Sequence, residues 1–228
     1  MLIRFLDNMN LVKNSKKGDK IVIKSYRSDI PTLKEAKTML EEAAKLNPGP
    51  WFEHSVYAAE AAQLIAQNCE GMNSDTAYVF GMLHDIGRRF GITGMRHIID
   101  GYHFLMEKGY YKVAKVCITH SFDCKDIKTA FGKWDCTEEE YNFVKQYLED
   151  IEYDDYDRLI QLCDALAYTT GFYLVEKRMV EAVLRHGVNE YTTLKWKATL
   201  ESKDYFEGKM GKSVYSILPG VVENTFGL

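Results

Sequence analysis

The chain has 228 residues, of which 46% are hydrophobic, so it can bury a core within one domain or one domain with a small appendage. Its formal net charge of -4 argues against a general binder of duplex DNA or RNA, which needs a basic face. A small phosphorylated substrate is still compatible with this charge, because a bound metal ion supplies positive charge locally.

The first 47 residues are expected to form an extension that packs on the main body. Within them, the sequence IVIKSY at residues 21–26 is compatible with a strand. The segment from Thr32 to Leu46 is predicted to be a helix with Thr32 as its N-cap. The sequence NPGP at residues 47–50 then marks a stop before the next element.

The remainder of the chain has the apolar spacing of consecutive helices. Ser74 is the expected N-cap of the second main helix, which should end at Gly87. Thr137 begins a later helix, whose acidic first turn suits the helix dipole. Strand signals are weak after residue 50, so the predicted fold class is mainly α. The expected helices cover residues 51–68, 74–87, 94–109, 110–121, 137–150, 155–170, 175–187 and 191–206.

Cysteine usage and the amino-terminal sequence indicate the compartment. The chain has five cysteines, an odd number, and no CxxC pair, which argues against a disulfide framework or a cysteine zinc site. Charges interrupt residues 1–20, so no signal peptide is expected, and no apolar run approaches the roughly 20 residues that span a bilayer. The sequence therefore predicts a cytoplasmic protein without a membrane partner.

Several residues of the kind that hold divalent metal ions recur along the predicted helices. His54 lies in the first turn of the first main helix, and the pair His84 and Asp85 ends the next apolar run. Asp164 lies in a later helix among apolar neighbours, where an unpaired ionised carboxylate is costly. A metal ion would explain this aspartate, and so would an N–H donor or a lysine.

This order of residues, with His54 first, then His84 and Asp85, then a distant Asp164, resembles the HD-domain superfamily of metal-dependent phosphohydrolases. The sequence HDIG at residues 84–87 matches a common form of the central doublet of that family. The resemblance covers about half of the chain and implies an HD-domain-like helical bundle. It divides the chain into an N-terminal extension at 1–47, an HD domain at 48–170 and C-terminal helices at 171–228 that pack on the domain.

Some members of the superfamily hold two metal ions and use two further histidines. His97, followed by Gly101 in an H-x-x-x-G pattern, and His120 match those positions. His103 is a rival for His97, but residues six apart on one helix point to different faces, and the pattern favours His97. The resemblance thus implies one or two divalent ions, of Fe, Mn, Zn, Ni or Mg, with Asp85 as the bridge. The implied ligands are His54, His84, Asp85, His97, His120 and Asp164.

Other polar residues near the doublet are candidates for contact with the substrate. Arg88 and Arg89 are predicted to bind it, because guanidinium groups bind phosphate in a bidentate fork; the alternative is that they are solvated or paired with acidic side chains. His186 is interpreted as a partner of a helix dipole and not as a ligand. The segment 123–136 is either a lid over the site or a connection. Candidates for the general acid, by proximity alone, are Glu53, Ser121 and Asp123.

The resemblance implies a metal-dependent phosphohydrolase that cleaves a phosphate ester by attack of a metal-bound hydroxide, with His84 and Asp85 as catalytic residues. The expected partner is a small phosphorylated molecule, with nucleotides among the candidates, and not duplex nucleic acid; a homodimer is left open. The alternatives are a catalytically silent metal-binding regulatory HD protein and an HD-fold di-iron oxygenase. A plain helical scaffold would bind no metal at all.

Overall fold

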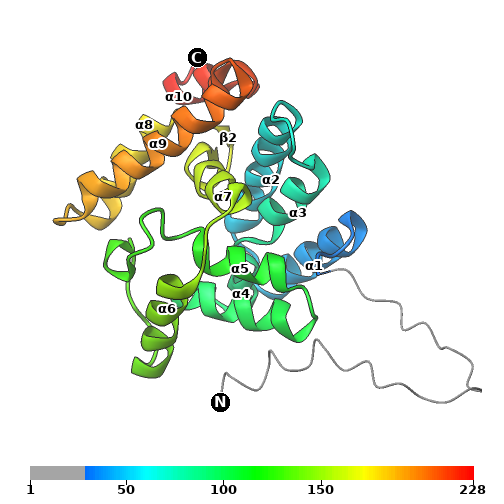
Figure 1. Ribbon diagram of the computed structural model, residues 1–228, viewed down its shortest axis with the longest axis vertical. Helices are drawn as coiled ribbons and strands as arrows, with labels where there is room; N and C mark the ends of the chain where they lie inside the picture. The colour runs from blue at the N-terminus through cyan, green and yellow to red at the C-terminus, as the bar shows by residue number, and fades with distance from the viewer. Residues whose placement is uncertain (1–28) are drawn as a thin grey trace, which may run out of the picture.

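Helices account for most of residues 29–228, the part of the chain that the computed structural model describes (Figure 1). The mainly α fold class is therefore confirmed. The helices are α1 (Leu33–Leu46), α2 (Trp51–Gln67), α3 (Ser74–Leu83), α4 (Arg96–Glu107), α5 (Tyr111–Thr119), α6 (Glu138–Asp150), α7 (Asp155–Leu166), α8 (Val175–His186), α9 (Thr192–Met210) and α10 (Val221–Phe226). Three 3-10 turns, η3 (Ile86–Phe90), η4 (Ile127–Thr129) and η5 (Val214–Ser216), and an antiparallel pair of strands, β1 (Ala167–Tyr168) and β2 (Gly171–Phe172), complete these elements.

Side-chain caps begin two helices where the sequence predicts them. Thr32 and Thr137 each accept a hydrogen bond from the backbone N–H three residues later, and a glutamate there bonds back to the cap residue. Such a capping box satisfies amide groups that have no partner within the helix. The expectation for the helix at residues 74–87 is wrong in its details, because Asn73 and not Ser74 caps it and it ends at Leu83.

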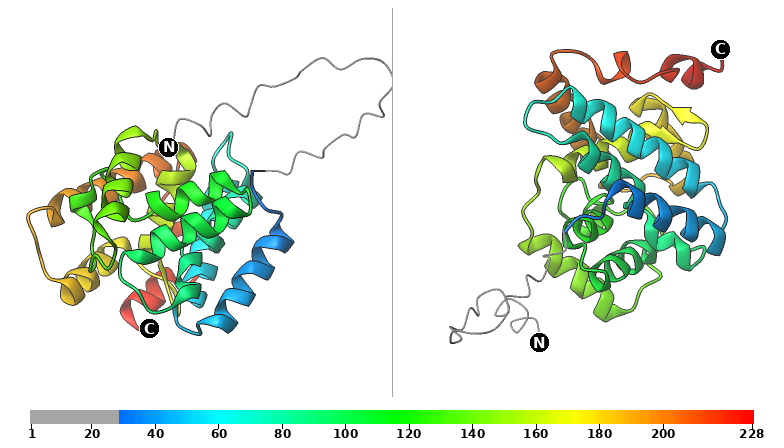
Figure 2. Two further views of the ribbon diagram at one scale, coloured as in Figure 1. Left: turned by 90° about the horizontal axis from the view of Figure 1, so that it is seen from below. Right: turned by 90° about the vertical axis from the view of Figure 1, so that its right-hand side faces the viewer.

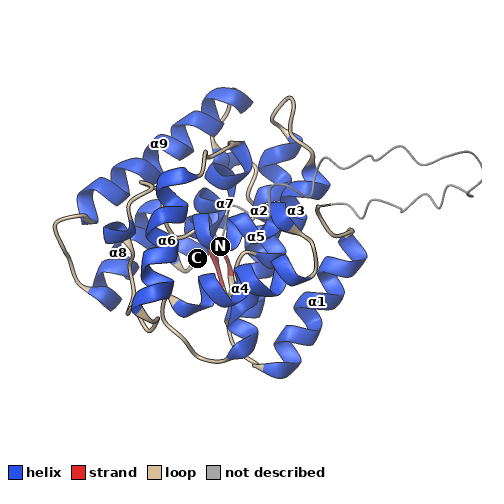
Figure 3. Ribbon diagram, turned by 60° about the horizontal axis from the view of Figure 1, so that its bottom comes forward, coloured by secondary structure: helices blue, strands red, loops and turns tan. Residues whose placement is uncertain are grey.

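The helix expected at residues 155–170 is shorter than predicted, and the strand expected near the N-terminus is not described. The helix expected at 155–170 ends at Leu166, where the chain turns into the short hairpin of β1 and β2; Figure 3 shows these strands in red among the helices. Gly171 has a φ of 139°, which only glycine adopts without strain, and this angle lets the chain reverse there. The strand expected at residues 21–26 lies outside the described residues.

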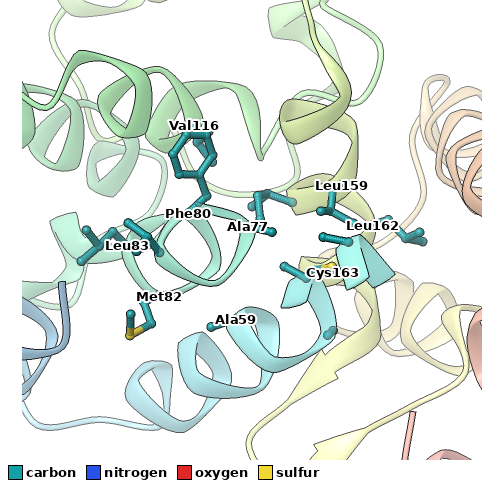
Figure 4. Packing of buried hydrophobic residues seen from close by; sticks show 14 of the residues in the cluster. Ala59, Ala77, Phe80, Met82, Leu83, Val116, Leu159, Leu162 and Cys163 are labelled. Atoms are coloured by element: carbon teal, nitrogen blue, oxygen red, sulfur yellow. The ribbon is translucent and has the colours of Figure 1, made fainter. Parts of the chain in front are cut away.

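Helix α2 lies at the centre of the main bundle and packs against α3, α7 and β1. Small residues allow this, because the alanines of α2 are fully buried at Ala58, Ala59, Ala61 and Ala62. A Cβ on Gly81 of α3 would lie 2.4 Å from the Cα of Ala59, so the two helix backbones touch at this glycine. Figure 4 shows Ala59 on α2 facing α3, with Phe80 directed toward Val116 of α5. This close crossing brings the start of α2 near the end of α3.

The remaining helices surround this centre. Helix α1 packs on α3 and η3 along one edge of the molecule (Figure 2). Helices α4 and α5 pack against each other, and α4 also contacts η3. Helices α8 and α9 contact α7 on the side of the molecule away from α1 (Figures 1 and 3). Within residues 29–228, no helix combines the length and the apolar character that crossing a bilayer requires.

Candidate metal centre

The predicted ligands come from several helices and helix ends and converge in one cluster. The ligand atoms of His54, His84 and Asp164 all lie within 4.8 Å of one another, and the same is true of His84, Asp85 and His120. His84 belongs to both sets. His97 adjoins the second set, with its Nε2 atom 3.2 Å from Asp85 Oδ1 and 3.5 Å from His120 Nε2. All six predicted ligands are therefore brought together.

Three imidazole rings in the cluster are oriented by the backbone. The Nδ1 atoms of His84, His97 and His120 lie 2.7, 2.6 and 3.1 Å from carbonyl oxygens three or four residues earlier in the chain. A carbonyl oxygen can only accept a hydrogen bond, so each Nδ1 atom carries the proton. The Nε2 atom of each neutral ring then presents a lone pair to the cluster. Orientation of this kind is typical of histidines that bind metal ions.

The carboxylate of Asp85 provides a test of whether this donor set suits a metal ion. Its Oδ1 atom is buried and accepts no hydrogen bond from any residue in the described part of the chain. It faces the Nε2 atoms of His97 and His120 at 3.2 and 3.6 Å. A buried carboxylate oxygen opposite two nitrogen lone pairs is unfavourable by itself, and a cation among them would reverse this. The residues therefore fit a divalent metal ion.

The protonation states of the buried histidines agree with a ligand role. Burial lowers the pKa of His97 to about 4, assisted by the charge of Arg88. Burial also lowers the pKa of His120 to about 3, assisted by His84. Although burial disfavours the charged form of Asp85, the adjacent Arg88 guanidinium and the imidazoles hold the pKa of that carboxyl well below its usual range. Near neutral pH, His97 and His120 thus offer neutral imidazoles beside the ionised carboxylate of Asp85.

The other end of the cluster is more open. Asp164 Oδ1 lies 2.8 Å from His54 Nε2 and 3.7 Å from His84 Nε2. The Asp164 side chain is 39% exposed, so it faces a cavity and is not enclosed by apolar neighbours as its sequence context suggests. Burial by the surrounding protein disfavours its charge, but contacts with the two imidazoles outweigh this and hold the pKa of Asp164 well below its usual range.

Two glycines explain how His97 reaches Asp85. A Cβ on Gly87 would lie 1.9 Å from His97 O and 2.5 Å from Gly101 N, so the backbones of η3 and α4 touch at this point. A Cβ on Gly101 would in turn lie 3.0 Å from Cys117 Sγ on α5. The glycine of the HDIG sequence and the glycine of the H-x-x-x-G pattern are thus the residues that let α4 pack against η3.

A residue that the sequence does not mark as functional holds the start of α4. The two carboxylate oxygens of Asp135 accept hydrogen bonds from Gly94 N at 2.6 Å and Arg96 N at 2.8 Å. Met95 N donates to Lys133 O at 2.9 Å. The end of segment 123–136 is therefore bonded to the helix that carries His97. No local pattern indicates this contact, because Asp135 lies 39 to 41 residues from its partners.

The cluster forms part of the wall of a cavity of about 570 Å³. Arg88 lines this cavity, with a side chain that is 31% exposed and an Nε atom 2.5 Å from Asp85 Oδ2. Arg89 is not brought to it, because its guanidinium lies 4.1 Å from the ring centre of Phe104 on α4. Successive residues of a 3-10 turn differ in direction by about 120°, so the two arginines point different ways.

Other histidines and arginines near the cluster are placed as follows. His103 stacks on Phe143 at a centroid distance of 6.2 Å and does not join the ligands. Arg96 pairs with Asp100 at 3.5 Å and Glu140 at 3.1 Å. His186 lies at the end of α8 and lines the cavity.

The candidates for the general acid also differ in position. Glu53 is exposed and does not line the cavity. Ser121 does, with its Oγ atom 3.1 Å from His120 Nε2. Asp123 lines it too and accepts a hydrogen bond from Thr199 Oγ1 at 3.0 Å. Burial raises the pKa of Asp123, although Lys195 opposes the shift. Of the three, Asp123 is the carboxyl group that is placed to hold a proton at the cavity.

One protein-family model matches the part of the chain that contains this cluster. The model of the HD domain matches residues 51–169, which is more than half of the chain and runs from α2 to the hairpin after α7. No curated protein and no solved structure matches the chain significantly. The match contains all six predicted ligands and excludes α1 and the helices from α8 onward. The domain boundaries at residues 47 and 170 stay a prediction.

Proposed function

Because the chain belongs to the HD-domain family, we propose that it is a metal-dependent phosphohydrolase that cleaves a small phosphate ester, with nucleotides among the candidate substrates. One observation carries this proposal: the buried Asp85 Oδ1 atom, without a hydrogen-bond partner among the described residues, faces the Nε2 atoms of His97 and His120. Together these atoms form an anionic, nitrogen-rich site beside a cavity that Arg88 also lines.

The six clustered residues would hold one or two divalent ions. Imidazole and carboxylate donors suit Fe, Mn, Zn or Ni better than Mg, which prefers oxygen ligands alone. When bound, such ions lower the pKa of water and offset the negative charge that develops on phosphoryl oxygens. His84 belongs to both sets of ligand atoms, but its Nδ1 is hydrogen-bonded to Gly81 O, so its one free nitrogen, Nε2, would serve a single ion. The carboxylate of Asp85 would be the ligand that two ions share.

The other residues of the site bind the ester and handle its proton. Arg88 binds phosphoryl oxygens, and its orientation is fixed because its Nε contacts Asp85 and its carbonyl oxygen accepts a bond from Asn47 Nδ2 at 2.6 Å. Asp123 donates the proton that the leaving oxygen needs when the P–O bond breaks, and it regains a proton from water. Arg89 is left out of this scheme because it contacts Phe104.

Metal content and turnover test the proposal together. Protein purified without added metal is analysed for its elements and assayed on a panel of phosphate esters. We expect about two ions per chain, as in other two-metal hydrolases, and ester hydrolysis that a chelator abolishes. His97→Ala and His120→Ala should each lower the content to about one ion, whereas His103→Ala, outside the cluster, should leave it unchanged.

Each other outcome supports a different conclusion. A protein that stays free of metal after manganese, zinc or iron is added would contradict the proposal altogether. Bound iron with oxygen consumption and no ester hydrolysis would indicate an oxygenase. Bound metal with neither activity would indicate a regulatory protein. One ion per chain, unchanged by both histidine substitutions, would restrict the site to its His54 and Asp164 end.

A further inference from the structure

The far wall of the cavity is built by a part of the chain that the family match does not include. Helices α8 and α9 follow residue 169, and both contribute side chains that line the cavity. At about 570 Å³, the cavity has the size of a site for a whole small molecule and exceeds what one phosphate group would fill. The properties of this wall therefore bear on which phosphate esters the site accepts.

All the charged side chains that α8 and α9 contribute to the cavity lining are basic or histidine. They are Arg178, Arg185, His186 and Lys195. The acidic residues of the lining, Asp85, Asp123 and Asp164, belong to the HD domain. The cavity thus has an acidic side, where metal ions would bind, and a basic side formed by the two C-terminal helices.

The positive charge of this basic wall is only partly offset. Arg178 pairs with Glu181 at 3.0 Å, and Lys195 Nζ donates to the carbonyl oxygen of Ser121 at 3.2 Å. The pKa of His186 is lowered by burial and by the charges of Arg185 and Lys195, so both cations act at the same place. Their combined field favours an anion there.

Two donors in the wall lack an acceptor. Arg178 Nε and Trp196 Nε1 are buried and donate no hydrogen bond to any residue of the described chain, and both side chains line the cavity. Buried donors are nearly always paired in native proteins, so an acceptor from a ligand is the natural partner. Phe131 also lines the cavity, 5.0 Å from Lys195 Nζ and 6.4 Å from the ring of His186, and provides an apolar surface for the rest of the ligand.

We propose that the wall formed by Arg178, Arg185 and Lys195 is a second anion subsite, so that the preferred substrate carries another phosphate or carboxylate group apart from the phosphate at the metal centre. This inference rests on the proposed function and narrows its substrate class. The first phosphate is placed by the HD domain, and the second anion is selected by helices α8 and α9.

Matched pairs of ligands test the subsite. Each pair has a monophosphate and a partner with a second anion on a similar scaffold: AMP with adenosine 3′,5′-bisphosphate, fructose 6-phosphate with fructose 1,6-bisphosphate, and glycerol 3-phosphate with 3-phosphoglycerate. Binding is measured by calorimetry on the metal-free full chain, where no turnover occurs, and KM is measured on the metal-loaded chain. In at least one pair, we expect the partner with the second anionic group to bind about tenfold tighter, which corresponds to one good charged contact. Preference in the last pair alone would identify the second anion as a carboxylate.

Charge-removing variants show whether the preference arises at this wall. Arg185→Gln and Lys195→Gln should each reduce the ratio of the two affinities by about fivefold or more, consistent with loss of one charged hydrogen bond. Lys197→Gln is the matched control on α9, because Lys197 is 73% exposed and does not line the cavity. The metal content of each variant is measured to separate this effect from damage to the cluster.

The proposed function and the subsite fail in different ways. Absence of turnover on every ester, with the pairwise preference in calorimetry retained, would contradict the hydrolase and leave the subsite standing. Equal affinity within every pair would overturn the subsite. It would also be overturned if Arg185→Gln and Lys195→Gln changed both members of each pair alike, or had no more effect than Lys197→Gln.

Discussion

The two ends of the ligand cluster are built in different ways. At the His54 and Asp164 end, the ligands lie on α2 and α7, which pack directly on each other in the core. At the His97 and His120 end, the ligands are almost fully buried, but His97 is placed by a glycine contact and by hydrogen bonds that the start of α4 donates to the distant Asp135. The first end depends on core packing, whereas the second depends on a few backbone contacts.

This difference predicts how each end fails. A change that separates α2 from α7 must disrupt the core, so loss of metal there should accompany loss of stability. A change in the contacts that hold α4 should release a metal ion from the second end while the fold survives. His84 stands between the two ends, since its Nε2 atom belongs to both sets of ligand atoms.

The largest effect is expected from His84→Ala, which should remove at least one bound ion and abolish ester hydrolysis. The residue is fully buried among the other ligands, so no neighbour can take its place. Elemental analysis of the purified variant measures the loss, and circular dichroism checks that the helices remain. His103→Ala is the control, because His103 stacks on Phe143 outside the cluster. Unchanged metal content and turnover in His84→Ala would show that this residue is not a ligand.

Gly87→Ala should act on the second end alone. The added Cβ would meet His97 O at 1.9 Å, so α4 must move away and carry His97 with it. We expect one of two metal ions to be lost and the free energy of unfolding to fall by about 1–3 kcal/mol, the usual cost of overpacking. Metal analysis and urea denaturation measure the two effects.

Two other glycine substitutions sharpen this result. Gly81→Ala would place a Cβ 2.4 Å from Ala59 Cα at the α2–α3 crossing in the core, and it should destabilise the fold without releasing metal from the second end alone. Gly208→Ala on α9 meets no atom within 4 Å and should stabilise its helix by up to about 1 kcal/mol. If Gly81→Ala and Gly87→Ala behaved alike, the contrast between the ends would be wrong.

Asp135→Ala should have a smaller effect, confined to metal affinity at the second end. Without this carboxylate, Gly94 N and Arg96 N lose their acceptor, and the start of α4 becomes less well held. Loss of such outer contacts costs about 10–100-fold in metal affinity, which titration with manganese or zinc measures. Asp126→Ala is the matched control, because Asp126 caps η4 in the same loop. An equal effect of both substitutions would attribute the change to the loop in general.

The smallest effect is a pH dependence of stability in the metal-free protein. The pKa of His97 is lowered to about 4 and that of His120 to about 3, mainly by burial. An unfolded histidine titrates near 6.5, so between about pH 6.5 and 4 the unfolded chain binds protons that these folded residues do not. The free energy of unfolding therefore falls as the pH falls.

His84 does not oppose this trend below about pH 6.5. Its pKa is raised by Asp164 and Asp85 against the effect of burial, so it changes stability only above the unfolded value near about 6.5, and below that pH it is charged in both states. The two lowered histidines therefore set the slope there, at about 1–3 kcal/mol per pH unit. Urea denaturation with a chelator present, at steps from pH 7 to 4, measures it. A stability that is constant or increases toward pH 4, or a slope unchanged in His97→Gln, would contradict the assignment.

Much of this protein can be predicted from the sequence, because the signals involved are local. Apolar spacing predicts the helices, and the Thr32 and Thr137 caps depend on residues only three positions away. The order from His54 to Asp164 also identifies the family. The prediction that Ser74 caps α3 is wrong, because Asn73 competes for the same amide groups. Sequence alone does not rank two adjacent cap residues.

What only the tertiary structure decides are the directions of side chains and the contacts between distant segments. Arg88 lines the cavity while Arg89 does not, although the two are adjacent, because a tight turn points them apart. Asp135 reaches α4 from a loop, and Lys195 reaches the cavity from α9, far along the chain. Local patterns determine which elements form, since their hydrogen bonds close within a few residues. The shape of the site depends on how those elements pack, and the packing involves the whole chain at once.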